Sequence, residues 1–175
     1  MSKDKSKQNI LEPLRIARKL EQEGKQFFAQ AAQSTASRLA RRTFEFLAKE
    51  EDKHLEKIHR FYHSLEQSGG KECPDIEYTD PDSKLAMFND KLAELKEEFK
   101  PTVTDIEAYR LALKFESGTE QFYTQKLSET DNPKIKKFYR WLIEEEKMHS
   151  RLLRSCLKFV EDPAEWFRSH KKLFS

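Results

Sequence analysis

The fold is decided by residues 44–65, which read FEFLAKEEDKHLEKIHRFYHSL. Apolar side chains recur there at alternating steps of three and four residues, which is the spacing of a helix that buries one seam in a bundle. The pattern is unbroken only if Glu51 and His54 share the seam with the apolar residues Phe44, Leu47, Ile58, Phe61 and Leu65. Burying an unpaired carboxylate costs several kcal/mol or more. The pattern therefore predicts that a cation meets Glu51 inside the fold.

The second half of the chain repeats this arrangement 95 residues later. Glu146 and His149 interrupt another seam, which is formed by Tyr139, Leu142, Leu153, Cys156 and Val160. Two further seams each lack one apolar step, and Glu21 and Glu116 occupy the missing positions. In both halves this Glu precedes the Glu of the Glu-x-x-His motif by 30 residues. The sequence therefore predicts a duplicated helical hairpin with a Glu on one helix and Glu-x-x-His on the other.

Four carboxylates and two imidazoles that converge inside a helix bundle form a dinuclear metal site. Positions i and i+3 of a helix point the same way, so Glu-x-x-His can give one metal an imidazole while its carboxylate bridges to a second metal. We predict Glu51 and Glu146 as the bridges, and as terminal ligands His54, His149, Glu21 and Glu116. Carboxylates with one imidazole per metal suit Fe or Mn best, with Zn and Co as alternatives.

The alternative for these six residues is a buried network of salt bridges and hydrogen bonds. Such a network needs cationic partners at the same height in the bundle. No Lys or Arg stands on the four seams near those positions, so the metal site is the better interpretation. A further Glu-x-x-His, formed by Glu56 and His59, lies off the seam and is expected on the surface. His63 and His170 are likewise expected on the surface or in packing.

Tyr123 is the candidate catalytic residue besides the six predicted ligands. It follows Glu116 by seven residues on the same seam, as Phe28 follows Glu21. A Tyr there could donate a hydrogen bond to a ligand carboxylate or to bound oxygen, and an ordinary core role fits the pattern equally well.

Gly24 follows Glu21 by three residues on its seam. A Gly inside a helix predicts the close approach of a neighbour or of the metal site, with simple tight packing as the alternative.

Composition narrows the class of protein. The chain has 175 residues, which suits one domain with a full core, and 37% of them are charged, as expected for long helices with charged outer faces. The net charge of +2 with interleaved signs predicts no nucleic-acid partner. No run approaches the about 18 apolar residues that span a membrane, and the polar N-terminus does not resemble a signal peptide. A cytoplasmic protein is expected. Two isolated Cys residues exclude a disulfide framework.

The helices can be placed by their capping and breaking residues. Ser34 to Ser37 supply N-cap candidates, Gly69-Gly70 ends a helix, Thr104-x-x-Glu107 is a capping box, and Asn132-Pro133 begins a helix. We predict an all-α four-helix bundle with one long crossover over 69–103 and a polar arm over 1–9. The predicted helices cover about 10–33, 37–67, 104–130 and 133–160, with a short C-terminal helix over about 163–173.

Four motifs resemble the rubrerythrin-like branch of the ferritin-like superfamily. They are Leu20-Glu21-Gln22-Glu23-Gly24-x-x-Phe27-Phe28, Leu47-Ala48-x-Glu50-Glu51-x-x-His54, Phe115-Glu116-x-x-x-x-Phe122-Tyr123 and Leu142-Ile143-Glu144-Glu145-Glu146-x-x-His149. The resemblance covers residues 11–160 apart from the crossover. It implies two Fe ions in a di-iron carboxylate centre within a ferritin-like four-helix bundle. Rubrerythrins proper reduce hydrogen peroxide to water and protect anaerobes and microaerophiles.

The chain departs from rubrerythrins proper in two ways. It lacks their rubredoxin-like domain with four Cys ligands, so the resemblance implies an external electron donor such as rubredoxin. It also has Thr119 where they carry an extra Glu three residues after the ligand of the third helix. Our leading hypothesis is a di-iron oxidoreductase that reduces peroxide or dioxygen, with a homodimer as the expected assembly. The alternatives are an iron-binding or iron-handling protein without turnover, and a bundle in which the metal serves stability alone.

Overall fold

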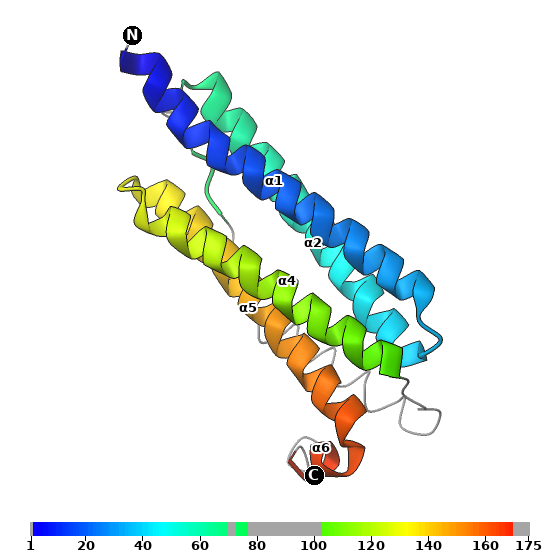
Figure 1. The fold of residues 1–175 in the computed structure, drawn as a ribbon. Coiled ribbons are helices and arrows are strands. Elements are labelled where there is room, and N and C mark those ends of the chain that lie inside the picture. Colours follow the sequence, from blue (N-terminus) through cyan, green and yellow to red (C-terminus); the bar gives the residue numbers. More distant parts are fainter. Residues whose placement is uncertain (1, 70–72, 77–102, 170–175) are drawn as a thin grey trace.

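The computed structural model describes residues 2–69, 73–76 and 103–169 (Figure 1). Within this part the helices are α1 (Ser2–Ser34), α2 (Arg38–Gln67), α4 (Val103–Ser128), α5 (Pro133–Glu161) and α6 (Pro163–Ser169). The predicted crossover lies largely outside the described residues, and so do the last residues of the predicted C-terminal helix. The described part contains no strand, and none of its helices has the length and apolarity needed to cross a membrane.

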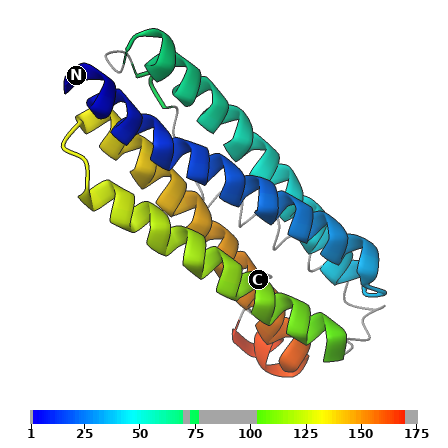
Figure 2. The same cartoon turned by 45° about the horizontal axis from the view of Figure 1, so that its top comes forward.

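The four long helices form two antiparallel hairpins, α1 with α2 and α4 with α5, which lie side by side (Figures 1 and 2). Helix α1 also packs on α4, and α2 packs on α5. The predicted all-α four-helix bundle is therefore confirmed. The short helix α6 follows and docks through Trp166, whose buried ring meets Phe159 edge-on and whose Nε1–H donates to the Ser155 hydroxyl at 3.1 Å.

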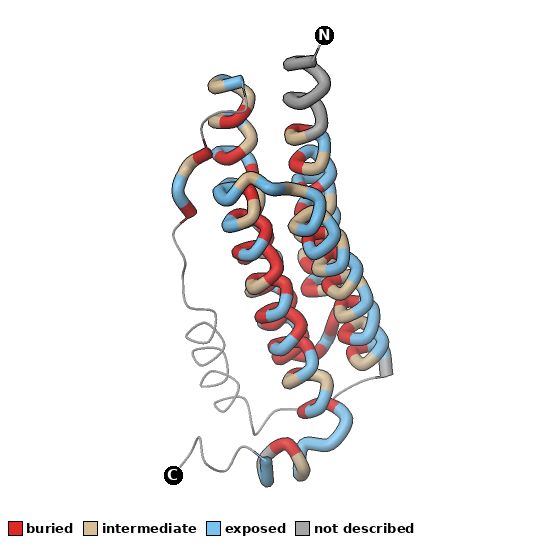
Figure 3. The backbone as a smooth tube through the Cα atoms, turned by 90° about the vertical axis from the view of Figure 1, so that its left-hand side faces the viewer, coloured by how far each residue is buried: buried red, intermediate tan, exposed pale blue. Residues whose placement is uncertain are grey.

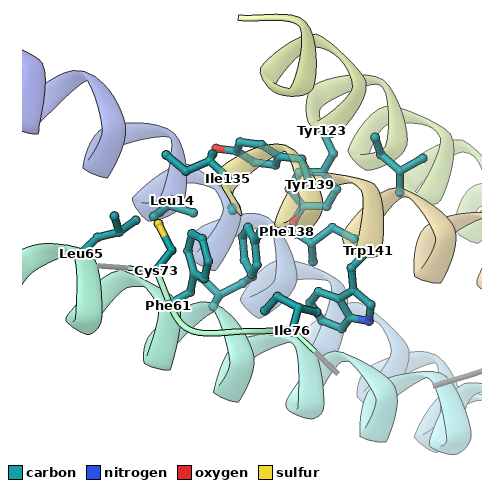
Figure 4. Close-up of a cluster of buried hydrophobic side chains, with 14 of the residues drawn as sticks. Leu14, Phe61, Leu65, Cys73, Ile76, Tyr123, Ile135, Phe138, Tyr139 and Trp141 are labelled. Carbon is teal, nitrogen blue, oxygen red and sulfur yellow. The ribbon is translucent and has the colours of Figure 1, made fainter. Parts of the chain in front are cut away.

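The seams of the four helices face inward and leave charged residues outside, so buried residues run as stripes along the bundle (Figure 3). They form two apolar clusters, one toward each end. The cluster nearer the α1–α2 turn includes Phe28, Phe44, Leu47, Tyr109 and Leu153. The other, shown in Figure 4, has Phe61 stacked on Phe138 at 4.1 Å between ring centroids. Each such side chain contributes about 1.5–3 kcal/mol by burial, so these clusters supply much of the stability.

Local signals place most helix ends as expected. The Ser37 hydroxyl accepts the backbone N–H of Ala40 and caps α2, and Asn132 caps α5 just before Pro133. Helix α2 ends at Gln67, and Gly69 follows with a φ of 65°, a conformation in which a side chain would be strained.

Two expectations about helix starts are wrong. Residues 2–9 continue α1 instead of forming a polar arm, because the segment contains no Gly or Pro and is rich in residues that tolerate a helix. Helix α4 begins at Val103, so Thr104 lies inside it rather than capping it. The helix also ends at Ser128, two residues before the predicted end.

Candidate metal centre

The six predicted ligands lie together in one buried layer between the two apolar clusters. Helices α1 and α4 each contribute one Glu, and α2 and α5 each contribute the Glu and His of a Glu-x-x-His motif. All six side chains are at most 1% exposed. They meet because each ligand stands near the middle of its helix, and antiparallel arms of equal length bring such residues to the same height. Whether they bind metal stays a prediction, but the structure places them where a metal could be held.

The layer divides into two half-sites with matching geometry. In the first, defined by Glu21 and His54, the His54 Nδ1 lies 2.8 Å from Glu21 Oε2, 3.3 Å from Glu51 Oε2 and 3.6 Å from Glu146 Oε1. In the second, defined by Glu116 and His149, the ring Nδ1 lies 3.3 Å from Glu116 Oε1, 3.5 Å from Glu51 Oε1 and 3.9 Å from Glu146 Oε2. The two imidazole rings are stacked, with centroids 5.1 Å apart.

Glu51 and Glu146 belong to both half-sites, and each turns one oxygen toward each histidine. In each half-site one nitrogen and several carboxylate oxygens lie within 4.8 Å of one another. This is the arrangement of two cation positions that share two carboxylates. Both histidines face the carboxylates with Nδ1, which leaves Nε2 to point away from the half-site.

Burial shifts the pKa values of the cluster strongly. It raises the pKa of Glu51 and Glu146 well above the ordinary value and that of Glu116 to about 7. Burial would also raise the pKa of Glu21, but hydrogen bonds with Glu51 and His54 lower it to about 2. Although burial disfavours a charged imidazole, Glu21 and Glu145 raise the pKa of His54 to about 10. The cluster therefore holds protons where no cation offsets its carboxylates.

The hydrogen bonding of the layer fits a bound cation better than a closed polar network. Several buried ligand atoms have no hydrogen-bond partner in the described part, among them both Glu116 oxygens, Glu51 Oε2, Glu146 Oε1 and both ring nitrogens of His149. Buried polar atoms are normally satisfied, so this many exceptions in one place require an explanation. Each ion pair that the six form among the described residues joins two of them or joins His54 to Glu145. The salt-bridge alternative needs Lys or Arg partners, and these contacts contain none.

Tyr123 is fully buried, and its hydroxyl donates a hydrogen bond to Glu21 Oε1. Burial raises the pKa of this phenol well above the usual 10, so it stays a proton donor. The hydrogen bond places Tyr123 against a predicted ligand, and its catalytic role stays a prediction. Phe28 occupies the corresponding position in the first half of the chain and belongs to an apolar cluster.

Gly24 is approached by both a neighbouring helix and the site. A Cβ atom at this position would lie 2.9 Å from Cε1 of Phe115 and 3.4 Å from the carboxyl carbon of Glu51. The predicted close approach of a neighbouring helix is therefore confirmed, and a predicted ligand, Glu51, lies almost as close. Thr119 is its counterpart 95 residues later; it is buried, and its hydroxyl donates to the backbone carbonyl of Phe115 at 3.2 Å.

Two buried carboxylates beside the six-residue layer were not predicted from the sequence. Glu50 and Glu145 are 2% and 1% exposed, and each directly precedes a predicted bridging Glu. They are absent from the predicted ligand set because both lie off the seams, beside other charged residues. The available signal was the internal repeat, since both halves place a Glu at this position. By contrast, His59 and His63 are exposed, as expected for the surface motif, and His170 lies outside the described residues.

Comparison with known proteins agrees with this geometry. The family model described as Rubrerythrin matches residues 12–157, which include every predicted ligand and most of each of the four seams. Searches of curated proteins and of solved structures give no match. The family assignment therefore depends on the family model and on the six-residue layer that the matched region contains.

Proposed function

This chain belongs to the rubrerythrin family, and on that premise we propose that its buried layer holds two iron ions and reduces hydrogen peroxide or dioxygen. The electrons would come from an external donor such as rubredoxin. Reducing one peroxide to two water molecules takes two electrons and two protons, and a pair of ferrous ions can supply both electrons. Assembly as a homodimer and a location in the cytoplasm belong to the same proposal.

One observation carries the proposal: six buried predicted ligands, several of whose polar atoms have no hydrogen-bond partner, surround two positions at which none of the described Lys or Arg residues forms a contact with them. Four carboxylates would balance the charge of two divalent ions. Oxygen ligands with one imidazole per metal suit iron or manganese, and zinc is the next alternative. The family makes iron the expected metal.

The protein's own residues would have distinct tasks at such a centre. Glu51 and Glu146 would bridge the two metal positions, and the other four ligands would each serve one position. Tyr123 would orient Glu21 by its hydrogen bond and keep a proton close to the reacting oxygen. The apolar clusters on both sides of the layer exclude bulk water, which strengthens each of these electrostatic contacts.

Anaerobic loading with ferrous iron followed by one equivalent of peroxide tests the proposal. We expect rapid stoichiometric oxidation, seen as near-ultraviolet absorption, together with about two irons per chain. The control is Glu51→Ala, which removes a carboxylate shared by both positions. Oxidation no faster than that of free iron in the same buffer would contradict the oxidoreductase.

Thr119 favours a second candidate, an iron-binding or iron-handling protein without turnover. Its hydroxyl is bonded to the helix backbone, and it stands where rubrerythrins proper carry an additional Glu. Repeated cycles separate the two candidates. The oxidoreductase is re-reduced by rubredoxin or another donor and consumes many equivalents of peroxide, whereas the iron-binding protein stops after one oxidation.

A further inference from the structure

The two half-sites repeat their ligands but differ in what surrounds those ligands. This inference depends on the metal centre proposed above and concerns the residues behind its histidines. Each position in the first half of the chain has a counterpart 95 residues later, so the surroundings can be compared residue by residue.

Behind His54, three side chains contact one another. Glu145 Oε2 lies 3.7 Å from His54 Nε2, the separation of an ion pair, and Glu145 Oε1 accepts the indole N–H of Trp141 at 3.1 Å. The Trp141 ring meets the His54 ring edge-on, with centroids 5.4 Å apart and planes at 88°. All three are at most 2% exposed. A carboxylate and an indole that are hydrogen-bonded to each other thus lie behind the His54 imidazole, the first at ion-pair distance and the second in edge-on ring contact.

In the other half of the repeat, the residues that correspond to Glu145 and Trp141 are Glu50 and Phe46. Phe46 has no N–H group, so it cannot fix a carboxylate as Trp141 does. Glu50 forms an ion pair with Lys53 on the same helix. Among the described residues, neither His149 Nε2 nor His54 Nε2 has a hydrogen-bond partner, so the two histidines differ in the 3.7 Å ion-pair contact that His54 makes with Glu145. The half-sites also differ in a second hydrogen bond. Tyr123 donates its hydroxyl hydrogen to Glu21, whereas the residue that corresponds to Tyr123 for Glu116 is Phe28, which has no hydrogen-bond donor on its side chain.

We propose that Glu145, held by Trp141, is a positioning residue that fixes His54 with Nδ1 toward the metal and Nε2–H toward the carboxylate, and so makes the two metal positions unequal. A carboxylate behind a ligating histidine fixes its tautomer and ring orientation and raises its basicity. Removing such a partner typically lowers metal affinity by about 10–100-fold. We expect this effect at one position alone, because in the described part of the chain His149 forms ion pairs only with predicted ligands and with no carboxylate equivalent to Glu145.

The test is a Co²⁺ titration of the metal-free protein at one fixed pH, followed by visible absorption and calorimetry. We expect the wild type to bind two ions in two distinguishable steps. In Glu145→Gln one step weakens by about 10–100-fold and the other is unchanged. Trp141→Phe keeps an aromatic ring against His54 and shows a smaller loss in the same step. The matched control is Glu50→Gln, the same change at the repeat position, which leaves both steps unchanged.

A spectroscopic readout separates positioning from a general effect on folding. In the Co²⁺ protein the exchangeable Nε2 protons of the two ligating histidines give separate shifted proton resonances. Glu145→Gln moves one of them and speeds its exchange with water, and Glu50→Gln moves neither. Equal effects of both variants on both steps, or no effect of Glu145→Gln and Trp141→Phe, would overturn the inference. Failure of the wild type to bind any metal would instead overturn the proposed function.

Discussion

The apolar clusters and the layer of six predicted ligands are equally buried and both draw on the four helix seams, yet their contributions to stability have opposite signs. In the clusters, Phe61 and Phe138 gain free energy by leaving water. In the layer, Glu51 and Glu146 lose hydration, and their raised pKa values record that loss. Burial alone therefore does not identify what stabilises this bundle. The layer is stabilised only when a cation or protons offset its carboxylates.

The largest expected effect comes from truncation inside a cluster. Phe61 is fully buried, so Phe61→Ala removes a packed ring and leaves a cavity. We expect the free energy of unfolding to fall by about 3–5 kcal/mol, measured by denaturant titration. The loss should be equal in metal-free and metal-loaded protein because the cluster's contribution does not depend on the layer. If the free energy of unfolding fell only in the metal-loaded protein, the contribution of the cluster would depend on the layer, which would contradict the comparison between the two regions.

Metal removal should have the next largest effect. Metal at the proposed centre would bind the folded layer alone, so loading at about 100 to 1,000 times the dissociation constant would stabilise the protein by about 2.7–4.1 kcal/mol. We expect the melting temperature, followed by circular dichroism, to drop after chelation and to recover on reloading. Metal content is measured on the same samples. An unchanged melting temperature after verified removal would count against a metal in this layer.

Glu51→Gln should change stability by less than the two changes above, and in the metal-free protein its effect should have the opposite sign to that of Phe61→Ala. The substitution removes a carboxylate shared by both half-sites, so two-metal binding is lost. In the metal-free protein it also removes a buried acid next to other acids, and we expect the free energy of unfolding at neutral pH to rise by about 1 kcal/mol. The exposed residue Glu45 on the same helix offers the control Glu45→Gln, which leaves stability unchanged. Destabilisation of metal-free Glu51→Gln would show that this carboxylate is already well paired.

The pH dependence of the metal-free protein should give the smallest effect. Because burial raises the folded-state pKa of Glu116 to about 7, its contribution to stability is present below the ordinary pKa of 4.5 and is lost as pH rises through 7. Glu116 should therefore lower the melting temperature at about pH 7.5 relative to about pH 5.5, against an opposite contribution from His149, whose pKa is lowered by burial. Glu116→Gln should reduce this difference. A melting temperature that rises over this interval in metal-free wild type, with no reduction in the variant, would contradict the assignment.

The sequence predicts the convergence of the six buried residues well because its signal is local and occurs twice. The three- and four-residue steps place Glu51 and His54 on the inner face of one helix, and the repeat does the same for Glu146 and His149. Convergence then needs only antiparallel hairpins with arms of equal length. The six residues could be chosen in this way before any distance was known.

Residues beside the seams could not be predicted in the same way. The burial of Glu50 and Glu145 depends on how closely neighbouring helices approach and on how each helix is rotated, and neither is encoded in periodicity. Trp141 also lies off the seam and is buried by tertiary packing. The prediction of a polar arm was wrong for a different reason: residues 2–9 form a helix although they have no apolar pattern that would indicate one.

The sharing of Glu51 and Glu146 has a consequence for assembly. Each half-site draws three donors from one hairpin and one from the other, so neither hairpin alone can complete a position. A bound metal pair would act as a reversible cross-link between residues 95 positions apart, much as a disulfide joins distant cysteines. Two separately produced hairpins would then recognise each other by completing one another's coordination, and metal supply would set how firmly the halves of the protein are held together.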